Sequence, residues 1–417
     1  MDVDKGHHSF PRHAQQQLIS ALEDTRVVIL QGARQVGKST LAIEVAERLA
    51  IPTALTLDDF TVREAALADP VGFIGGLARP VVLDEVHRAP KIIYAVKEAV
   101  DADRRPGQFL LTGSVNIFTA PNIREALTGR IEAVRLWPLA QSEIEHSPVN
   151  VVDELFAGSP PRISGAPLGR QAYVRRAAAG GYPEPRLREG SRRARWFQNY
   201  IDGVLQRDLR SISDIRRLDE MPRLLRILAS QAANILSTRK LATSLSIGHE
   251  TVQAYIQLLE TVFLVHRVPA WRPGLRAREV HAPKVHLVDT GLLSYLVGAD
   301  EARIADDPKI TGMIFENFVA MEMLRHAEWA TTPTRQYHWR EDDLEVDVVL
   351  ESAAGDVVAV EAKASATADE RDVRAMALFR DQRGSAFKAG VVVYTGPNTV
   401  PLGDRLWAVP VSGLWSG

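Results

Sequence analysis

The sequence predicts an α/β protein in three parts: a domain with a parallel sheet, a helix-rich middle region, and a second α/β domain. Short apolar runs alternate with helical patterns over the first third of the chain, as is typical of buried parallel strands. Helical spacing dominates the middle third, and strand patterns return after it. We therefore expect domains at residues 1–145, 165–285 and 286–417.

The composition is that of a soluble globular chain. Of 417 residues, 46% are hydrophobic and 24% are charged, and no apolar run approaches the about 18 residues that span a bilayer. Residues 1–8 lack the apolar core of a signal peptide. The absence of cysteine excludes disulfides and thiolate metal sites. We therefore expect a cytoplasmic protein without a membrane partner.

The elements of the first domain follow from apolar runs and turn residues. We expect strands at residues 26–30, 54–58, 81–85 and 108–113, with a helix at 40–50. Proline and glycine gather at residues 147–167, which predicts a loop between the first two domains.

A phosphate-binding loop follows the first predicted strand. Its residues are Gly32-Ala33-Arg34-Gln35-Val36-Gly37-Lys38-Ser39-Thr40. This G-x-x-x-x-G-K-[ST] spacing between a strand and a helix is typical of a P-loop, in which backbone N–H groups and a helix N-terminus meet phosphate. We expect Lys38 to bind the β- and γ-phosphates and Ser39 to bind magnesium. The sequence thus predicts ATP with Mg²⁺ as the ligand.

Acidic and polar residues end the neighbouring predicted strands. An apolar strand that ends in Asp84-Glu85 predicts a cation partner, with Asp84 on magnesium and Glu85 on an attacking water. Ser114 and then Asn116 follow the next strand, and Ser114 is our first choice for a residue that senses the γ-phosphate. A solvated strand end and simple turn chemistry are the alternatives.

Seven segments together resemble the AAA-type ATPases of bacteria and archaea that carry a C-terminal domain of unknown function. They are Gln31 to Thr40, Leu83-Asp84-Glu85-Val86-His87-Arg88-Ala89-Pro90, Leu111-Thr112-Gly113-Ser114, Leu127-Thr128-Gly129-Arg130, Trp137-Pro138-Leu139, Gly180-Gly181-Tyr182-Pro183 and Asp289-Thr290-Gly291-Leu292-Leu293. The resemblance implies an ATPase core that assembles with further copies of the chain. It also implies Arg130 as an arginine finger in cis or in trans, with an ordinary salt-bridging arginine as the alternative. His87 departs from the family pattern, in which glutamine is more frequent.

The middle region is basic and contains a helix-turn-helix pattern. Between Arg162 and Lys284 we count about 22 Lys and Arg against about 10 Asp and Glu, an excess that attracts nucleic acid. Helices are expected at residues 239–245 and 249–259, with a turn at Gly248 and a strand of a wing at 263–269.

A winged helix that reads DNA would use polar residues of this pattern. Arg239 and Lys240 would bind phosphates, and the second helix would present His249, Thr251 and Gln253, with Glu250 and Tyr255 on or near the same face. Winged helices also bind proteins, and Glu250 would repel phosphates. DNA is the favoured partner, and a protein is the alternative.

The C-terminal domain contains a carboxylate and lysine pattern. A predicted hairpin places Asp347 on one strand and Glu361 and Lys363 on one face of the next, with Glu316 on a preceding helix. This set resembles the PD-(D/E)xK nuclease superfamily, with Val346 in place of the usual proline. The resemblance implies a nuclease-like fold in which Asp347 and Glu361 bind magnesium and Lys363 assists cleavage. A fold retained for binding alone is the alternative.

The combined hypothesis is an ATP-hydrolysing protein that acts on nucleic acid. ATP would gate DNA binding, remodelling or magnesium-dependent cleavage through the packing of the three domains. The alternatives are a regulatory ATPase switch that binds a protein partner, with a non-cleaving nuclease-like domain, and a remodelling motor.

Overall fold

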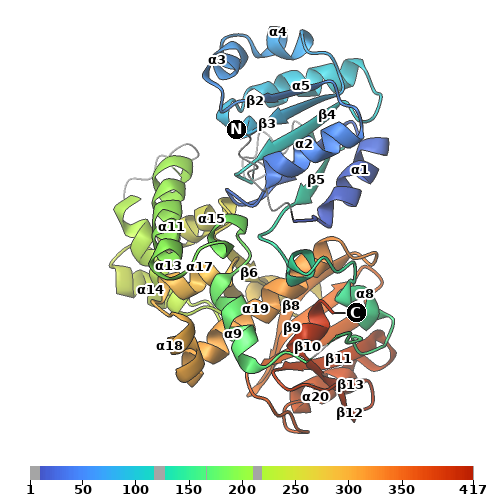
Figure 1. Ribbon diagram of the computed structural model, residues 1–417, viewed down its shortest axis with the longest axis vertical. Helices are drawn as coiled ribbons and strands as arrows, with labels where there is room; N and C mark the ends of the chain where they lie inside the picture. The colour runs from blue at the N-terminus through green and yellow to red at the C-terminus, as the bar shows by residue number, and fades with distance from the viewer. Residues whose placement is uncertain (1–9, 117–126, 166, 210–217, 417) are drawn as a thin grey trace, which may run out of the picture.

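The computed structural model describes residues 10–116, 127–165, 167–209 and 218–416. The N-terminal domain, the helical region and the C-terminal domain occupy separate parts of the molecule (Figure 1). Residues 1–8, where no signal peptide is expected, lie outside the described residues. Within the described ranges, no helix is long and apolar enough to cross a membrane.

The N-terminal domain is built on a five-stranded parallel sheet, as predicted. The strand order is β2-β3-β4-β1-β5, and every described pairing is parallel. Its strands are β1 (Val27–Gln31), β2 (Thr53–Thr56), β3 (Val81–Asp84), β4 (Phe109–Gly113) and β5 (Ile131–Arg135). Its helices are α1 (Ala14–Asp24), α2 (Lys38–Arg48), α3 (Phe60–Ala68), α4 (Pro70–Gly75), η1 (Val86–Arg88) and α5 (Ile92–Ala102). Because β1 and β4 are buried at every position, apolar cores form on both faces of the sheet.

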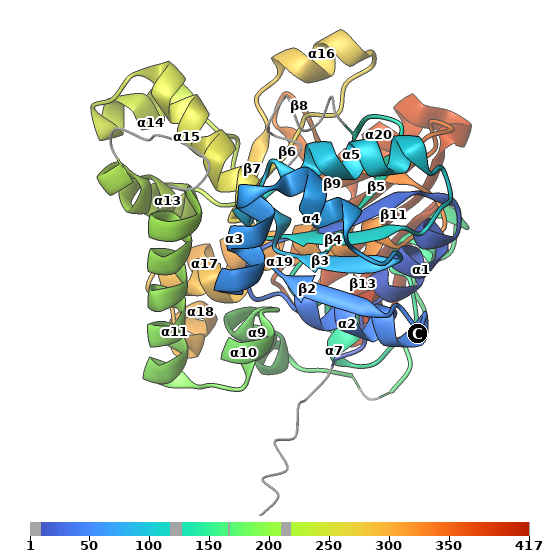
Figure 2. The same cartoon turned by 90° about the horizontal axis from the view of Figure 1, so that it is seen from above.

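Most helices of the helical region lie on one flank of the molecule, whereas α16 (Leu275–Val280) projects apart from them (Figure 2). Its elements are α9 (Arg170–Ala179), α10 (Pro183–Arg186), α11 (Gly190–Gly203), η3 (Val204–Asp208), η4 (Leu218–Glu220), α13 (Met221–Ser230), α14 (Thr238–Leu245), α15 (His249–Thr261), β6 (Val265–Val268), α16 (Leu275–Val280), β7 (Lys284–Leu287), α17 (Thr290–Leu296) and α18 (Glu301–Asp306). The two helices α14 and α15 are followed by an antiparallel pair, β6 and β7, which fits the order predicted from the sequence.

Two of the predicted boundaries differ from the structure. The predicted loop at residues 147–167 contains α8 (Val151–Phe156), preceded by the short α7 (Gln141–Ile144). Asn150 caps α8 and donates from Nδ2 to the carbonyl of His326, which attaches this segment to the C-terminal domain. The boundary predicted between residues 285 and 286 falls inside β7. Sequence patterns missed both features because tertiary contacts hold these segments.

The C-terminal domain has a mixed six-stranded sheet in the order β12-β13-β11-β10-β9-β8. Its elements are α19 (Pro308–Glu328), β8 (Thr334–Glu341), β9 (Leu344–Ser352), β10 (Val357–Lys363), α20 (Arg374–Arg383), η5 (Gly384–Ala386), β11 (Phe387–Tyr394), β12 (Val400–Gly403), β13 (Leu406–Pro410) and η6 (Val411–Leu414). The predicted hairpin is present as the antiparallel pair β9 and β10. Side chains of α19 and α20 belong to two different apolar cores of this sheet.

Candidate nucleotide site and C-terminal carboxylate cluster

The P-loop lies between β1 and α2, as predicted. Gly37 has a φ of 97° and Gln35 a φ of 61°, so the loop uses the left-handed region twice. A Cβ atom at Gly32 would lie 2.0 Å from the carbonyl oxygen of Leu136. Glycine is therefore required at position 32 by the close approach of a neighbouring backbone.

Hydrogen bonds connect the predicted metal ligands to one another. Ser39 Oγ donates to Asp84 Oδ1 over 2.7 Å, and Thr112 Oγ1 donates to the same oxygen over 2.6 Å. Thr56 Oγ1 donates to the other oxygen, Asp84 Oδ2, over 3.0 Å. Lys38 Nζ donates to the carbonyl of Ala33 over 2.9 Å. Burial lowers the pKa of the Lys38 ammonium, although Glu85 and Asp84 partly offset this effect.

Glu85 is held in a strained backbone conformation beside this network. Its φ of 57° is uncommon for a residue with a side chain, and such conformations concentrate at functional sites. Glu85 Oε2 accepts from the Ser114 N–H over 3.1 Å and lies 3.0 Å from His87 Nδ1. Burial alone would raise the pKa of Glu85, but His87, Lys38 and the Ser114 N–H together lower it to about 2. The carboxylate is therefore ionised at neutral pH.

Ser114 and His87 both lie next to the carboxylate of Glu85. The Ser114 hydroxyl is buried and has no hydrogen-bond partner among the described residues. His87, which departs from the family pattern, contacts the carboxylate expected to activate water. Sequence reasoning did not assign His87 this contact, because the left-handed turn at Glu85 creates it.

A small pocket of about 100 Å³ adjoins the P-loop. It is lined by Phe10, Arg12, Val36, Gly37, Thr40, Leu41, Glu44, Leu139 and Pro183. Its walls thus combine apolar side chains with the start of α2. Leu139 and Pro183 come from two of the segments that carry the family resemblance.

Three of those segments meet in one buried junction. The carboxylate of Asp289 accepts from the backbone N–H of Gly181 over 2.5 Å and from that of Leu292 over 2.8 Å. The N–H of Leu139 donates to the carbonyl of Gly181 over 2.8 Å. A Cβ atom at Gly181 would lie 2.4 Å from the Leu139 oxygen. These motifs therefore join the N-terminal domain to the helical region.

Two further contacts connect the nucleotide site to the helical region. Arg34 of the P-loop donates from Nη1 to Asp208 Oδ1 over 2.9 Å, and the Asp208 side chain is only 2% exposed. Asp208 ends η3, a single turn of π-helix, a form that is frequent at functional sites. The Asn116 N–H, two residues after Ser114, donates to the carbonyl of Thr261 at the end of α15 over 2.9 Å. Sequence patterns missed Asp208 because it lies 174 residues from Arg34.

Arg130 lies at the far end of the parallel sheet from the P-loop. Ile131 pairs with Val27 at the start of β1, whereas the P-loop follows the end of β1. Arg130 donates from Nε and Nη2 to the carboxylate of Asp101 over 2.6 and 3.1 Å. An action in cis on its own nucleotide does not fit this position. A role as an arginine finger in trans stays a prediction.

The predicted nucleic-acid contacts lie on α14 and α15. Arg239, Lys240 and Gln253 are exposed, whereas Thr251 and His249 are half-buried. His249 Nε2 lies 2.6 Å from the hydroxyl of Thr238. The prediction that Tyr255 lies on or near the exposed face is wrong, because its side chain is buried in the core, with 7% exposure. Its spacing six residues after His249 puts it on the inner side of α15.

The C-terminal site brings together the residues predicted from the nuclease-like pattern. Glu316 comes from α19, Asp347 from β9, and Glu361 and Lys363 from β10. Asp347 Oδ2 accepts from the N–H of Ala362 over 3.0 Å, and Lys363 Nζ lies 3.3 Å from Glu361 Oε1. Burial and Asp347 raise the pKa of Glu316 and that of Glu361, the latter to about 8.

Two residues that sequence reasoning missed complete this site. Lys284 of β7 extends its ammonium to Glu316 Oε1 at 2.6 Å, Glu345 Oε1 at 2.5 Å and Asp347 Oδ1 at 3.0 Å. We call Glu316, Glu345 and Asp347 the carboxylate cluster, since their oxygens all lie within 4.8 Å of one another. Glu345 was detectable, because it lies two residues before Asp347 on the same face of a strand. Lys284 had no comparable signal in the sequence.

The acids that converge around Lys284 differ from the predicted magnesium pair of Asp347 and Glu361, which stays a prediction. Among the described residues, the acids that converge are Glu316, Glu345 and Asp347, and Glu361 is not in that group. Their centre is occupied by the Lys284 ammonium, which would repel a divalent ion at contact distance. Mg²⁺ therefore does not fit the donor set as arranged.

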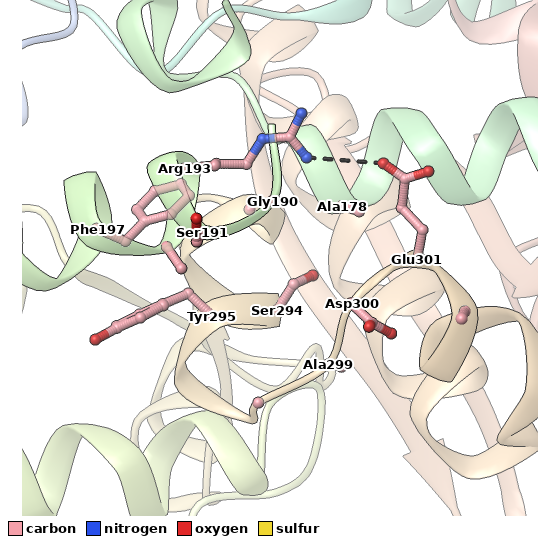
Figure 3. Close-up of a pocket in the computed structure, with 14 residues that line it drawn as sticks. Ala178, Gly190, Ser191, Arg193, Phe197, Ser294, Tyr295, Ala299, Asp300 and Glu301 are labelled. Carbon is pink, nitrogen blue, oxygen red and sulfur yellow. Dashed lines mark ion pairs between the residues drawn. The ribbon is translucent and has the colours of Figure 1, made fainter. Parts of the chain in front are cut away.

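A separate cavity of about 630 Å³ lies between α11 and the α17–α18 segment (Figure 3). Arg193 and Glu301 face each other across it, with Nη1 and Oε1 3.8 Å apart. Phe197 and Tyr295 supply apolar lining. None of its lining residues belongs to the nucleotide site or to the carboxylate cluster.

Comparisons with known protein families divide the chain into three matched segments. Residues 24–145 match the family described as an AAA domain. Residues 170–303 match a domain of unknown function, DUF8612, and residues 311–414 match another, DUF4143.

Among curated proteins, the chain is similar to uncharacterized proteins of mycobacteria and of an archaeon. The relatives in Mycobacterium tuberculosis and Mycobacterium bovis are each 28% identical over 407 residues, which is 97% of this chain and 84% of the relative. A relative in Methanocaldococcus jannaschii is 22% identical over 245 residues, which is 57% of this chain and 53% of the relative.

Solved structures give weaker likenesses. A single-residue variant of the RuvB protein of Thermotoga maritima is 19% identical, with a TM-score of 0.30, over 61% of this chain and 89% of the other. A signal transduction ATPase with numerous domains from Pyrococcus horikoshii is 11% identical, with a TM-score of 0.20, over 75% of this chain and 49% of the other. The P-loop geometry, the parallel sheet and the AAA match lead to one conclusion: the N-terminal domain is an AAA-type P-loop ATPase domain, followed by two domains of unknown function.

Proposed function

We propose that the chain hydrolyses ATP and binds nucleic acid through α14 and α15, with the nucleotide at the P-loop controlling that binding. The observation that carries the proposal is the hydrogen bond from the Asn116 N–H to the carbonyl of Thr261. It joins the strand end beside the γ-phosphate position to the last residue of α15. A movement of the segment that follows β4 would therefore be transmitted to α15 through this hydrogen bond.

The chemistry at the nucleotide site follows from the residues around Asp84. Ser39 and Asp84 would hold Mg²⁺, and they fit this role because Oγ and Oδ1 already lie 2.7 Å apart beside the P-loop. The ion would supply charge neutralisation at the phosphates. Lys38 would bind the β- and γ-phosphates, and Glu85, ionised at neutral pH, would orient the attacking water.

Three further features would complete this site. The unpartnered hydroxyl of Ser114 is suited to sense the γ-phosphate. The apolar pocket between Phe10, Leu41 and Pro183 adjoins the start of α2 and would take the base. Arg130 would act on the nucleotide of a neighbouring copy, which makes a homo-oligomer part of the proposal.

Transmission to the helical region would use the ion pair of Arg34 and Asp208. A phosphate in the P-loop offers Arg34 a second anionic partner, so the nucleotide competes with Asp208 for the same guanidinium. The turn η3, which continues α11 and ends at Asp208, would then respond to the nucleotide together with α15. Phosphodiester cleavage is not part of this proposal, because the carboxylate cluster contains Lys284.

The test is DNA binding as a function of nucleotide and salt. We expect wild-type protein to bind duplex DNA at low salt, with an affinity that differs between ATP and ADP. Arg239→Ala with Lys240→Ala should reduce the slope of log affinity against log salt by about 1.8, since each lost phosphate contact removes about 0.9. The matched control, Arg48→Ala with Arg104→Ala, removes two exposed arginines of the N-terminal domain and should leave the slope unchanged.

A second candidate function is favoured by one residue. Glu250 is exposed in the first turn of α15, where a carboxylate would repel phosphates. A regulatory ATPase that binds a protein through α15 would use this charge. Failure of the wild type to bind DNA at low salt, in any nucleotide state, would reject the first function in favour of this one.

A further inference from the structure

The ammonium group of Lys284 has the contacts expected of a cation resident in the carboxylate cluster. An ammonium has three N–H donors, and Lys284 meets three carboxylate oxygens at 2.6, 2.5 and 3.0 Å. The contacts with Glu316 and Asp347 are hydrogen bonds between an ammonium and a carboxylate, which are stronger than bonds between neutral groups. The Lys284 side chain is only 2% exposed, so water does not replace these partners.

We propose that Lys284 takes the place of a divalent metal ion in the carboxylate cluster. The cluster then joins the helical region to the C-terminal domain and does not support metal-dependent cleavage. Lys284 belongs to β7, whereas the carboxylates belong to α19 and β9. The ion pairs with Glu316 and Asp347 therefore connect residues that are 32 and 63 positions apart in the chain.

The backbone around Lys284 is fixed on both sides of β7. Lys284 pairs with Val268 of β6, and the carbonyl of Val285 accepts from the Ala233 N–H over 2.7 Å. Asn317, the residue after Glu316, donates to the carbonyl of Leu287 and accepts from its N–H, both over 2.9 Å. The backbone of Lys284 is thus held in register with the same helix that supplies Glu316.

A metal ion and the lysine exclude each other at this position. Mg²⁺ requires oxygen ligands at about 2.0–2.1 Å and near-octahedral geometry. With the ammonium within 3.0 Å of an oxygen of each carboxylate, such an ion would contact a second cation. Removal of the lysine would leave three facing carboxylates, which repel one another and offer oxygen ligands to a divalent ion.

The experiment measures Mn²⁺ binding to the nucleotide-free full chain by the electron paramagnetic resonance signal of the free ion. Lys284→Met should gain a Mn²⁺ site that disappears when Asp347→Asn is added. This site should be at least about tenfold tighter than any Asp347-dependent site in the wild type, a difference of about 1.4 kcal/mol. Mn²⁺ should also raise the unfolding midpoint of Lys284→Met by more than that of Lys284→Met with Asp347→Asn.

The control variant is Lys388→Met. It removes a lysine that pairs with Asp356 at 3.0 Å, away from the carboxylate cluster, and should behave as the wild type does. If Lys284→Met does not fold, the double variant Lys284→Met with Glu345→Gln is titrated in its place. The second substitution removes one of the three carboxylates that repel one another once the lysine is gone. The proposal is overturned if wild-type protein binds Mn²⁺ at an Asp347-dependent site that is less than about tenfold weaker than the site in Lys284→Met, or if the folded lysine variant binds none. Wild-type DNA cleavage with Mg²⁺ that Asp347→Asn abolishes would overturn it as well.

Discussion

Arg12 lies outside the P-loop motif but donates hydrogen bonds that hold the loop in place. Replacing Arg12 should therefore measure how much these bonds contribute to the free energy of unfolding and to ATP binding. Its guanidinium donates to the carbonyl of Val36 over 2.6 Å, to that of Trp137 over 2.7 Å and to Glu143 Oε1 over 3.0 Å. The side chain is 7% exposed. Arg12→Met keeps much of the length of the side chain and removes all three donors.

The expected loss of stability depends on whether Glu143 keeps hydrogen-bond partners once the Arg12 guanidinium is removed. Removing one partner of a buried ion pair costs ~3–5 kcal/mol. Glu143 retains hydrogen bonds from the backbone N–H groups of His13 and Ala140, each over 3.0 Å. We therefore expect a loss at the lower end, about 3 kcal/mol, from the free energy of unfolding of the N-terminal domain. ATP binding should weaken about tenfold, because the Val36 carbonyl of the P-loop loses its partner.

Urea denaturation can follow this loss through tryptophan fluorescence, to which Trp137 beside Arg12 contributes with the other six tryptophans. The matched control is Arg105→Met, which removes an arginine that is 76% exposed and paired with Asp103. Exposed pairs contribute less than about 1 kcal/mol. A loss below about 1 kcal/mol for Arg12→Met, or a loss equal to that of the control, would refute this role of Arg12.

Three further predictions concern the nucleotide site and acid stability. Lys38→Ala should abolish ATP turnover, because the ammonium that meets the phosphates is lost; unchanged turnover in a pure sample would contradict this role. Gly32→Ala should abolish ATP binding in a calorimetric titration, because its Cβ would lie 2.0 Å from the Leu136 oxygen. Normal affinity would instead show that the Leu136 backbone can move to admit a side chain. Burial lowers the pKa of His326 to about 3 and that of His338 to about 4, so the folded chain binds fewer protons than the unfolded chain below about pH 6.5. Each buried ring should therefore lose about 2 kcal/mol of stabilisation between pH 7 and pH 5. Since the raised pKa of Glu361 changes stability in the opposite direction, denaturation of His338→Gln is compared with that of the wild type, and an unchanged pH dependence in the variant would count against a buried neutral ring.

The nucleotide site shows how much local sequence can determine. The P-loop, the strand that ends in Asp84-Glu85 and the strand before Ser114 were all predicted from the sequence. Parallel strands bring their carboxyl ends to one edge of a sheet, so three separate motifs meet without further information. The hairpin that places Asp347 near Glu361 was predictable for a similar reason, since its strands are neighbours in the chain.

Contacts between distant segments were not predictable in this way. Arg34 and Asp208 are 174 residues apart, and neither has a pattern that indicates the other. Lys284 lies in a short apolar strand, which suggests burial but does not identify its partners. Arg130 matched a motif, but the sequence did not indicate that it precedes β5 at the far end of the sheet from the P-loop.

The sequence by itself determined the P-loop fold of the N-terminal domain and the order of the three domains. Local patterns of glycine, charge and apolar spacing encode both, because each depends on residues within one or two elements. Only the tertiary structure decided what occupies the carboxylate cluster and how the P-loop contacts the helical region. Those answers depend on which side chains meet after the chain has folded, and a lysine 63 residues from Asp347 decides the first of them.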